Sequence, residues 1–129
     1  FVAASGWGEV VGGESGFFVR RHPDTLRAPD VAVYSQARLA RIVDRQGFPD
    51  VPPDLVVEIH DPSEPDLDRK VQQYLEAGVR AVWVVDPRVL SLTRYAPGEP
   101  PQTWSSPDAV VAEPVLPGFA CPLGELLAP

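Results

Sequence analysis

The sequence contains no methionine, one cysteine and two histidines in 129 residues. A single thiol, Cys121, cannot form an internal disulfide, so the cysteine content does not point to secretion, and a reducing cytoplasm is the expected compartment. No apolar run approaches the roughly 18–20 residues that a membrane helix needs. Because the chain begins at Phe1 and lacks methionine, we expect its natural start to lie upstream.

Several common catalytic motifs are also missing. The sequence has no C-x-x-C or H-E-x-x-H metal pattern and no G-x-S-x-G nucleophile turn. Gly12-Gly13 is not followed by the lysine-bearing helix of a phosphate-binding loop. The sequence therefore does not indicate a nucleotide cofactor.

Positive charge is scarce, because 11 basic residues face 18 acidic ones and the net charge is −7. This balance argues against broad, non-specific binding to nucleic acid, which normally uses a basic surface. The arginines are nevertheless clustered in the first third of the chain, and the simpler interpretation is that they are ordinary solvated side chains. They are Arg20, Arg21, Arg27, Arg38, Arg41 and Arg45.

What the sequence does contain is the composition of one globular domain over residues 1–129, with 44% hydrophobic and 22% charged residues. Its 16 prolines make element boundaries readable. Strands 9–11 and 16–19 are expected to flank a glycine-rich turn, and an irregular apolar pattern over 35–47 predicts a short helix. The other expected strands are 30–34, 55–60, 79–85, 90–95 and 109–115.

The clearest unit is a strand, a helix and a strand between residues 55 and 85. Ser63 is the expected helix N-cap and Gly78 the stop signal. This spacing predicts a βαβ unit, in which the two strands are parallel and the helix covers one face of the sheet. Tyr74 and Trp83 are expected to be core aromatics. The later strands are expected to be more exposed. Because they are apolar, they and Trp104 are candidates for a homodimer edge.

Three charged residues stand out against these elements: Asp30, Glu58 and Lys70. Both carboxylates lie in apolar, β-branched runs, where an unpaired charge is costly to bury. Helical spacing puts Lys70 at the edge of the apolar stripe, from which its ammonium can reach the end of the strand that carries Glu58. The alternative is that the carboxylates are turn acceptors and that Lys70 is a solvated charge.

Two carboxylates and a lysine suit phosphoryl chemistry. Mg²⁺ usually takes one or two protein carboxylates together with waters and phosphate oxygens. Such an ion activates water and stabilises the leaving oxygen, and a nearby lysine can orient the water or neutralise the phosphate. Asp30 and Glu58 suit the metal role and Lys70 suits the third role. His60 shares the strand face of Glu58 and is a candidate accessory residue.

An ordered series of motifs resembles a known family. The series runs through G-F-F-V at 16–19, R-A-P-D-V-A at 27–32, P-D-L-V-V-E-I at 53–59, K-V-Q-Q-Y-L-E-A-G-V at 70–79, V-W-V-V-D-P at 82–87 and L-P-G-F at 116–119. It is similar to the Uma-two type of restriction-endonuclease-like proteins, a bacterial branch of the PD-(D/E)XK nuclease superfamily.

The resemblance implies an α/β (α+β) fold, with a mixed central β-sheet flanked by helices. It implies that Asp30 and Glu58 bind Mg²⁺ or Mn²⁺ and that DNA is the substrate. The superfamily lysine normally stands two residues after the glutamate, where this chain has His60, so Lys70 on the following helix is its match. The N-terminal helix that often supplies a further acidic ligand is expected to be missing, and Glu9 or Glu14 are candidates to replace that ligand.

Two other functions stay open at this point. The acidic charge and the histidine at position 60 would also suit a nuclease fold that has lost efficient chemistry and serves binding or assembly. A small-molecule phosphoesterase would tolerate the acidic surface as well. The sequence therefore predicts a metal-dependent DNA endonuclease, with an inactive binding module as the main alternative.

Overall fold

The structure is a computed structural model that describes residues 6, 8–12, 16–20, 25–27, 29–42, 49–63, 65–105, 109–111 and 113–123. Two helices are described, α2 (Gln36–Leu39) and α3 (Leu67–Glu76). Neither of these helices is long and apolar enough to cross a membrane. The strands in chain order are β1 (Gly8–Gly12), β2 (Phe17–Arg20), β3 (Thr25–Arg27), β4 (Val31–Ser35), β5 (Leu55–Ile59), β6 (Ala81–Asp86), β7 (Ser91–Tyr95), β8 (Gln102–Ser105), β9 (Ala109–Val111) and β10 (Ala120–Pro122).

A mixed six-stranded sheet forms the centre, in the order β1-β4-β5-β6-β7-β8. β5 and β6 are parallel, as predicted, and the other neighbouring pairs are antiparallel. The predicted pairing of strands 9–11 and 16–19 is wrong. β1 instead pairs with β4, and β2 forms a separate two-stranded sheet with β3. The fold class is thus α+β, as expected.

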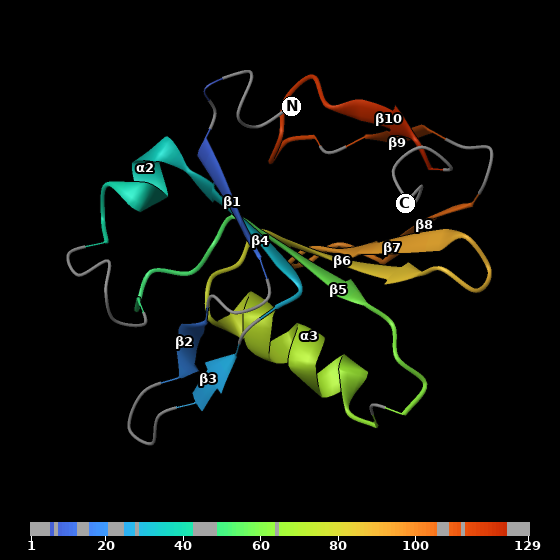
Figure 1. The fold of residues 1–129 in the computed structure, drawn as a ribbon, viewed down its shortest axis with the longest axis horizontal. Helices are drawn as coiled ribbons and strands as arrows, with labels where there is room; N and C mark the ends of the chain where they lie inside the picture. Colours follow the sequence, from blue (N-terminus) through green and yellow to red (C-terminus); the bar gives the residue numbers. More distant parts are fainter. Residues whose placement is uncertain are drawn as a thin grey trace.

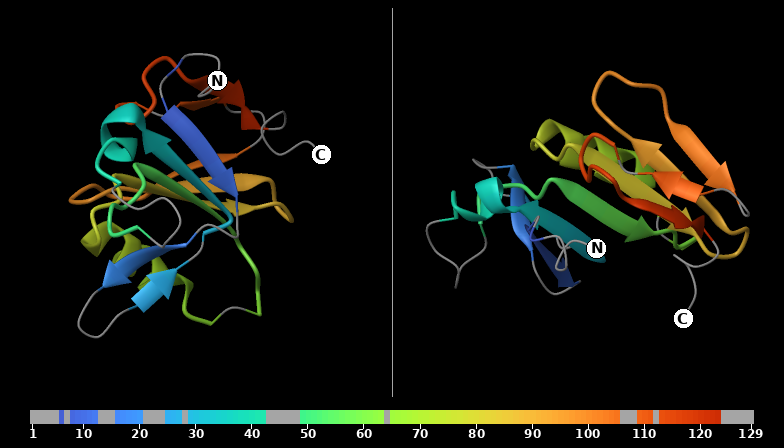
Figure 2. Two further views of the ribbon diagram at one scale, coloured as in Figure 1. Left: turned by 60° about the vertical axis from the view of Figure 1, so that its left-hand side comes forward. Right: turned by 90° about the horizontal axis from the view of Figure 1, so that it is seen from above.

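The sheet is covered differently on its two faces. Figure 1 shows α3 and the β2–β3 hairpin on one side of the sheet and the β9–β10 pair on the other, and the views in Figure 2 agree. The α3 side buries a cluster around Tyr74 and Val71 of the helix, Phe17 of β2, and Val56 and Val82 of the parallel strands. The ring centroids of Phe17 and Tyr74 are 5.7 Å apart. Burial of this apolar stripe fixes α3 against β5 and β6.

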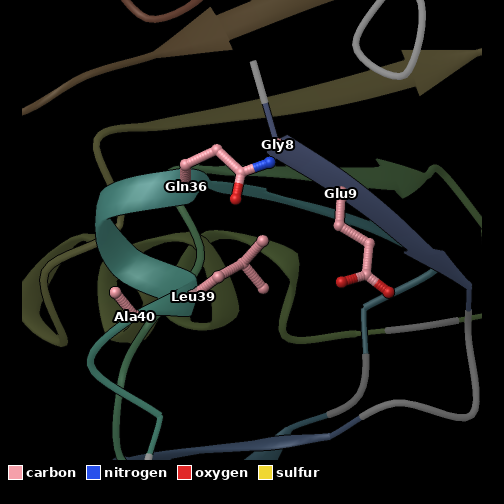
Figure 3. Close-up of a pocket in the computed structure, with 5 residues that line it drawn as sticks. All are labelled: Gly8, Glu9, Gln36, Leu39 and Ala40. Atoms are coloured by element: carbon pink, nitrogen blue, oxygen red, sulfur yellow. The ribbon is translucent and has the colours of Figure 1, made fainter. Parts of the chain in front are cut away.

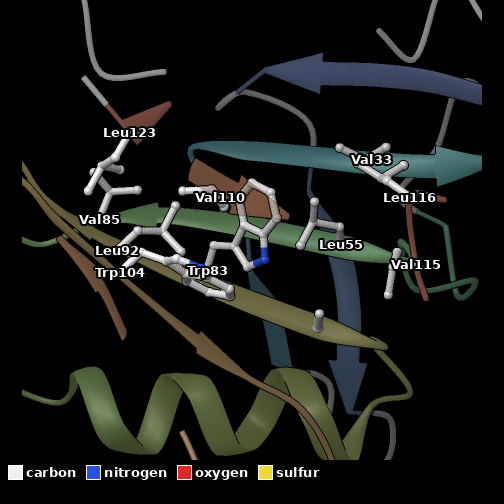
Figure 4. Packing of buried hydrophobic residues seen from close by; sticks show 11 residues of the cluster. Val33, Leu55, Trp83, Val85, Leu92, Trp104, Val110, Val115, Leu116 and Leu123 are labelled. Atoms are coloured by element: carbon white, nitrogen blue, oxygen red, sulfur yellow. The ribbon is translucent and has the colours of Figure 1, made fainter. Parts of the chain in front are cut away.

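The opposite face holds the second part of the core, in which Trp83 and Trp104 lie among aliphatic residues from β4 to β7 and the C-terminal segment (Figure 4). The prediction of exposed late strands is therefore wrong in part. Trp104 is only 8% exposed and belongs to the core, although its strand β8 is the last in the order of the six-stranded sheet. The homodimer edge stays a prediction. Val110 and Val115 are also buried, because β9 and the turn after it close this face of the sheet.

The helix boundaries differ from the sequence expectation. Ser63 does not cap α3: its N–H and hydroxyl both donate to Asp61 Oδ1, at 2.9 and 2.8 Å, and the helix begins four residues later, at Leu67. Gly78 does end the helix, with a φ of 105° that favours glycine. The short helix predicted within 35–47 is α2, which covers only Gln36–Leu39. Ser35 is its N-cap, and the Ser35 hydroxyl accepts a hydrogen bond from the Arg38 backbone N–H. Residues 43–48 lie outside the described residues.

Candidate active site

The pairing of β4 with β5 brings the two predicted carboxylates together. Val31 pairs with Val57, so continuing the antiparallel register by one residue places Asp30 opposite Glu58. The Ile59 N–H donates to Asp30 Oδ2 at 2.8 Å, which fixes the Asp30 carboxylate against the end of β5. Asp30 is exposed, and one of its oxygens remains for another partner.

Glu58 is the buried member of the pair, only 3% exposed on the α3 side of β5. The Tyr74 hydroxyl donates to its Oε1 at 2.7 Å, and Lys70 Nζ lies 3.3 Å from its Oε2. Burial raises the pKa of Glu58, the Tyr74 hydrogen bond and the Lys70 charge oppose that rise, and the Asp30 charge adds to it. Asp30 and Glu58 are thus close enough for their charges to repel, as is typical of paired carboxylates that share a cation.

One face of α3 supplies the remaining groups. Lys70, Gln73 and Tyr74 are three and four residues apart, so they lie on the same side of the helix. The helix phase predicts that Lys70 reaches Glu58, and the 3.3 Å contact has this geometry. The catalytic role of the three predicted residues stays a prediction.

Tyr74 takes part in the site through a contact that the sequence did not predict. It is fully buried, as expected for a core aromatic, but its hydroxyl is bonded to Glu58. Burial and this hydrogen bond raise the pKa of Tyr74, whereas the nearby Arg27 charge lowers it. The phenol is therefore a permanent donor that holds the Glu58 carboxylate in one orientation.

Arg27 approaches the same helix from β3. Its Nε and Nη2 both donate to Gln73 Oε1, at 2.9 and 2.6 Å. The sequence offered no signal for this pair, because the residues are 46 positions apart and a glutamine on a helix is usually solvated.

His60 lies just beyond the end of β5 and belongs to a different group of charges. Its backbone N–H donates to the Val85 carbonyl at 2.7 Å. The carboxylates nearby have partners of their own: hydrogen bonds from Ser63 lower the pKa of Asp61, and the Arg88 side chain lowers the pKa of Asp86. In the described part of the chain, no hydrogen bond or ion pair joins the His60 ring to Glu58. The structure therefore does not bring His60 into contact with the three predicted residues.

Asp54, which precedes β5, marks the opposite end of the parallel strands. It is 2% exposed, and its side chain accepts from the Ser35 N–H at 2.7 Å. Arg38 Nε and Arg80 Nη1 lie 3.5 and 3.4 Å from its Oδ2. These partners make Asp54 a structural ion-pair centre, located where β5 begins, whereas Glu58 lies near the end of that strand.

The residues that could hold a metal ion are Asp30 and Glu58. Among the described residues, no group of three or more His, Cys, Asp or Glu side chains is placed to hold one. Glu9 lies on the edge strand β1 and lines a different pocket, with Gln36 and Leu39 of α2 (Figure 3). Glu14 lies outside the described residues. The donor set is therefore a pair of hard carboxylate ligands, and Mg²⁺ commonly binds such a pair together with waters.

A mixed sheet with paired carboxylates and a lysine at one strand end defines a restriction-endonuclease-like protein. Residues 1–124 match the family model Uma2, described as "Putative restriction endonuclease". The chain belongs to this family, and membership supports a nuclease function.

A solved structure has the same fold. It is a putative nuclease belonging to DUF820 from Anabaena variabilis ATCC 29413, with a TM-score of 0.75 and 20% sequence identity. The alignment covers 98% of this chain and 71% of that one. No curated protein matches this chain.

Proposed function

We propose that this protein is a Mg²⁺- or Mn²⁺-dependent endonuclease that hydrolyses DNA phosphodiester bonds. The observation that carries the proposal is the juxtaposition of Asp30 with Glu58, and of Glu58 with Lys70 at 3.3 Å, on the α3 side of the sheet. Membership in a family described as "Putative restriction endonuclease" supports the same reaction class.

Asp30 and Glu58 would hold the ion through carboxylate oxygens. Each carboxylate oxygen has two lone pairs. The donors already present are the Ile59 N–H on Asp30 and the Tyr74 hydroxyl and Lys70 Nζ on different oxygens of Glu58, and they leave lone pairs for a cation. When bound, the ion supplies Lewis-acid polarisation of the phosphoryl oxygen and a bound water of lowered pKa. The raised pKa of Glu58 fits this role, because a cation relieves the cost of its buried charge.

The other residues position and compensate charge. Lys70 holds a positive charge beside Glu58, where it orients the attacking water or neutralises the phosphate. The hydrogen bond from Tyr74 holds the Glu58 carboxylate in place. This matters because a displacement of about 1 Å in a catalytic group can lower the reaction rate strongly. Hydrolysis consumes one water and breaks one P–O ester bond of the DNA backbone. It leaves one phosphate monoester end and one hydroxyl end.

One observation favours a second candidate, a nuclease-fold module that binds or assembles without efficient chemistry. The net charge is −7, and within the described ranges only two carboxylates meet at the site. Such a module would bind metal weakly and would not turn over nucleic acid.

The test is cleavage of supercoiled and linear duplex DNA in Mg²⁺ and in Mn²⁺, together with calorimetric titration of each metal. Glu58→Gln keeps the shape of the side chain and an acceptor for Tyr74, but it removes the charge. Glu76→Gln is the matched control, because Glu76 is an exposed residue on the same helix. We expect Glu58→Gln to lose metal binding and cleavage, and Glu76→Gln to keep both. Cleavage at the wild-type rate by Glu58→Gln would refute the mechanism. Weak or absent metal binding by the wild type, without any cleavage, would favour the second candidate.

A further inference from the structure

Arg27 is a cation that is held without a counter-charge. Its guanidinium is half-buried between β3 and α3, and both of its bonds to the helix go to one amide oxygen of Gln73. In the parts of the chain that the structure describes, no carboxylate forms an ion pair with this guanidinium. A glutamine oxygen fixes the orientation of an arginine but does not neutralise it.

Two other arginines that are largely shielded from solvent have carboxylate partners. Arg38 forms an ion pair with Asp54 at 3.5 Å, and Arg94 forms one with Glu99 at 3.4 Å. A charge removed from water is costly unless it is paired, so a half-buried arginine beside a neutral acceptor is suited to an anion from outside the chain.

The location of Arg27 identifies that anion. Gln73, which holds the guanidinium, is one turn along α3 from Lys70, and Tyr74 bridges to Glu58. Gln73 directly precedes Tyr74, so the guanidinium is held on α3 next to the residue that bonds to Glu58. Arg27 is also three residues before Asp30 in the chain. The cation is therefore held on the part of α3 that contacts Glu58, and a ligand longer than the carboxylate pair would extend toward it.

The guanidinium also has donors to spare. Gln73 takes the Nε–H and one hydrogen of Nη2, which leaves one hydrogen on Nη2 and both on Nη1. A terminal pair of N–H groups of this kind matches two oxygens of a phosphate.

We propose that Arg27 binds a backbone phosphate of the nucleic acid, adjacent to the phosphate that is cleaved, and that Gln73 is the positioning residue that presents the guanidinium. This inference rests on the proposed nuclease function and adds a substrate contact to it. It also explains how an acidic protein can bind a polyanion at its active site, since an oriented arginine held on α3 one turn from Lys70 supplies local positive charge.

The experiment measures how DNA binding depends on salt, because each phosphate contact contributes about 0.9 to the slope of log K against log salt for duplex DNA. Fluorescence anisotropy of a labelled duplex oligonucleotide is followed over a KCl series in Ca²⁺, with the full chain. We expect Arg27→Gln to reduce the slope by about one phosphate contact, and Arg27→Lys to retain the wild-type slope.

A second variant tests the same contact without removing the arginine. Gln73→Glu has nearly the same shape but gives Arg27 a carboxylate partner, so it should lower the slope as Arg27→Gln does. Gln72→Glu makes the same change of charge at the exposed neighbouring position and should keep the wild-type slope. This comparison decides the matter even if Arg27→Gln does not fold.

The outcomes separate the inference from the proposed function. If the wild type binds DNA and both Arg27→Gln and Gln73→Glu keep its slope, Arg27 does not contact phosphate, while the proposed DNA substrate stands. If affinity falls but the slope does not, Arg27 has only a structural role and the inference is wrong. If the wild type neither binds nor cleaves DNA, the proposed substrate and the inference both fail.

Discussion

The hydrogen bond from Tyr74 to Glu58 gives the sharpest stability prediction, through the substitution Tyr74→Phe. Phenylalanine keeps the ring against Phe17 but removes the hydroxyl that donates at 2.7 Å to a carboxylate only 3% exposed. A hydrogen bond to a charged group contributes about 1.5–3 kcal/mol, and a buried acceptor left without its donor loses that amount. With a urea m value of about 2 kcal/mol/M, the denaturation midpoint should fall by about 1 M.

The loss should depend on pH in a defined direction. Burial raises the pKa of Glu58, and the Tyr74 hydroxyl opposes this rise, so Tyr74→Phe raises the folded-state pKa further. A glutamate with a raised folded-state pKa stabilises the fold at low pH, and this contribution is lost as the pH rises through the folded-state pKa. The variant should therefore be close to the wild type near pH 4 and show its full deficit near pH 8.

Urea denaturation followed by circular dichroism at these two pH values, in a chelating buffer, measures both effects. Tyr95→Phe is the control, because Tyr95 packs on the same cluster at the α3 side and, among the described residues, its hydroxyl has no hydrogen-bond partner. The control should stay within about 0.5 kcal/mol of the wild type. Equal midpoints for Tyr74→Phe and the wild type at pH 8 would show that the hydroxyl does not stabilise Glu58.

Two further substitutions test the framework by the same denaturation assay. Gly78→Ala should lower the free energy of unfolding by about 1–2 kcal/mol, because a φ of 105° is strained for alanine and the added Cβ would lie 3.2 Å from Pro52. Gly12→Ala is the control, because open space surrounds Gly12 and the substitution should be close to neutral. Equal losses for the two variants would contradict this explanation. Trp104→Ala should cost about 3–5 kcal/mol, as expected for a large core aromatic. Val111→Ala, at a position 43% exposed on the neighbouring strand, is its control, and a near-neutral Trp104→Ala would argue that Trp104 is not part of the core.

The central unit of the fold could be predicted from the sequence because its signals are local and strong. The apolar run that includes β6 and the one-sided stripe of α3 can each adopt few other structures, and their spacing requires a parallel crossover. The pairing of β1 could not be predicted, because a short strand next to glycines suits a hairpin as well as a distant partner. Strands β3, β8 and β10 are three or four residues long and carry too little periodicity to be recognised.

The candidate site shows the same division. Asp30, Glu58 and Lys70 could be located because each is a charge in or beside an apolar run, and the strand and helix periods set their directions. The roles of Tyr74 and Gln73 could not, because an apolar stripe shows that a side chain is buried but not which polar atom its hydroxyl or amide meets. The prediction of Ser63 as the N-cap of α3 is wrong for a related reason. The neighbouring Asp61 carboxylate accepts from both the N–H and the hydroxyl of Ser63, and this local turn replaces the cap.

Arg38 anchors the parallel strands β5 and β6 at the ends where they begin. Its Nη1 donates to the carbonyls of Pro52, Pro53 and Gly78, so it joins the segments that lead into β5 and β6. The strands are thus anchored at the ends where they begin, whereas Glu58 lies near the end where β5 finishes. A substitution at Asp30 or Glu58 leaves all three of these hydrogen bonds in place, so the entry of both parallel strands keeps its anchor when the carboxylate pair is changed.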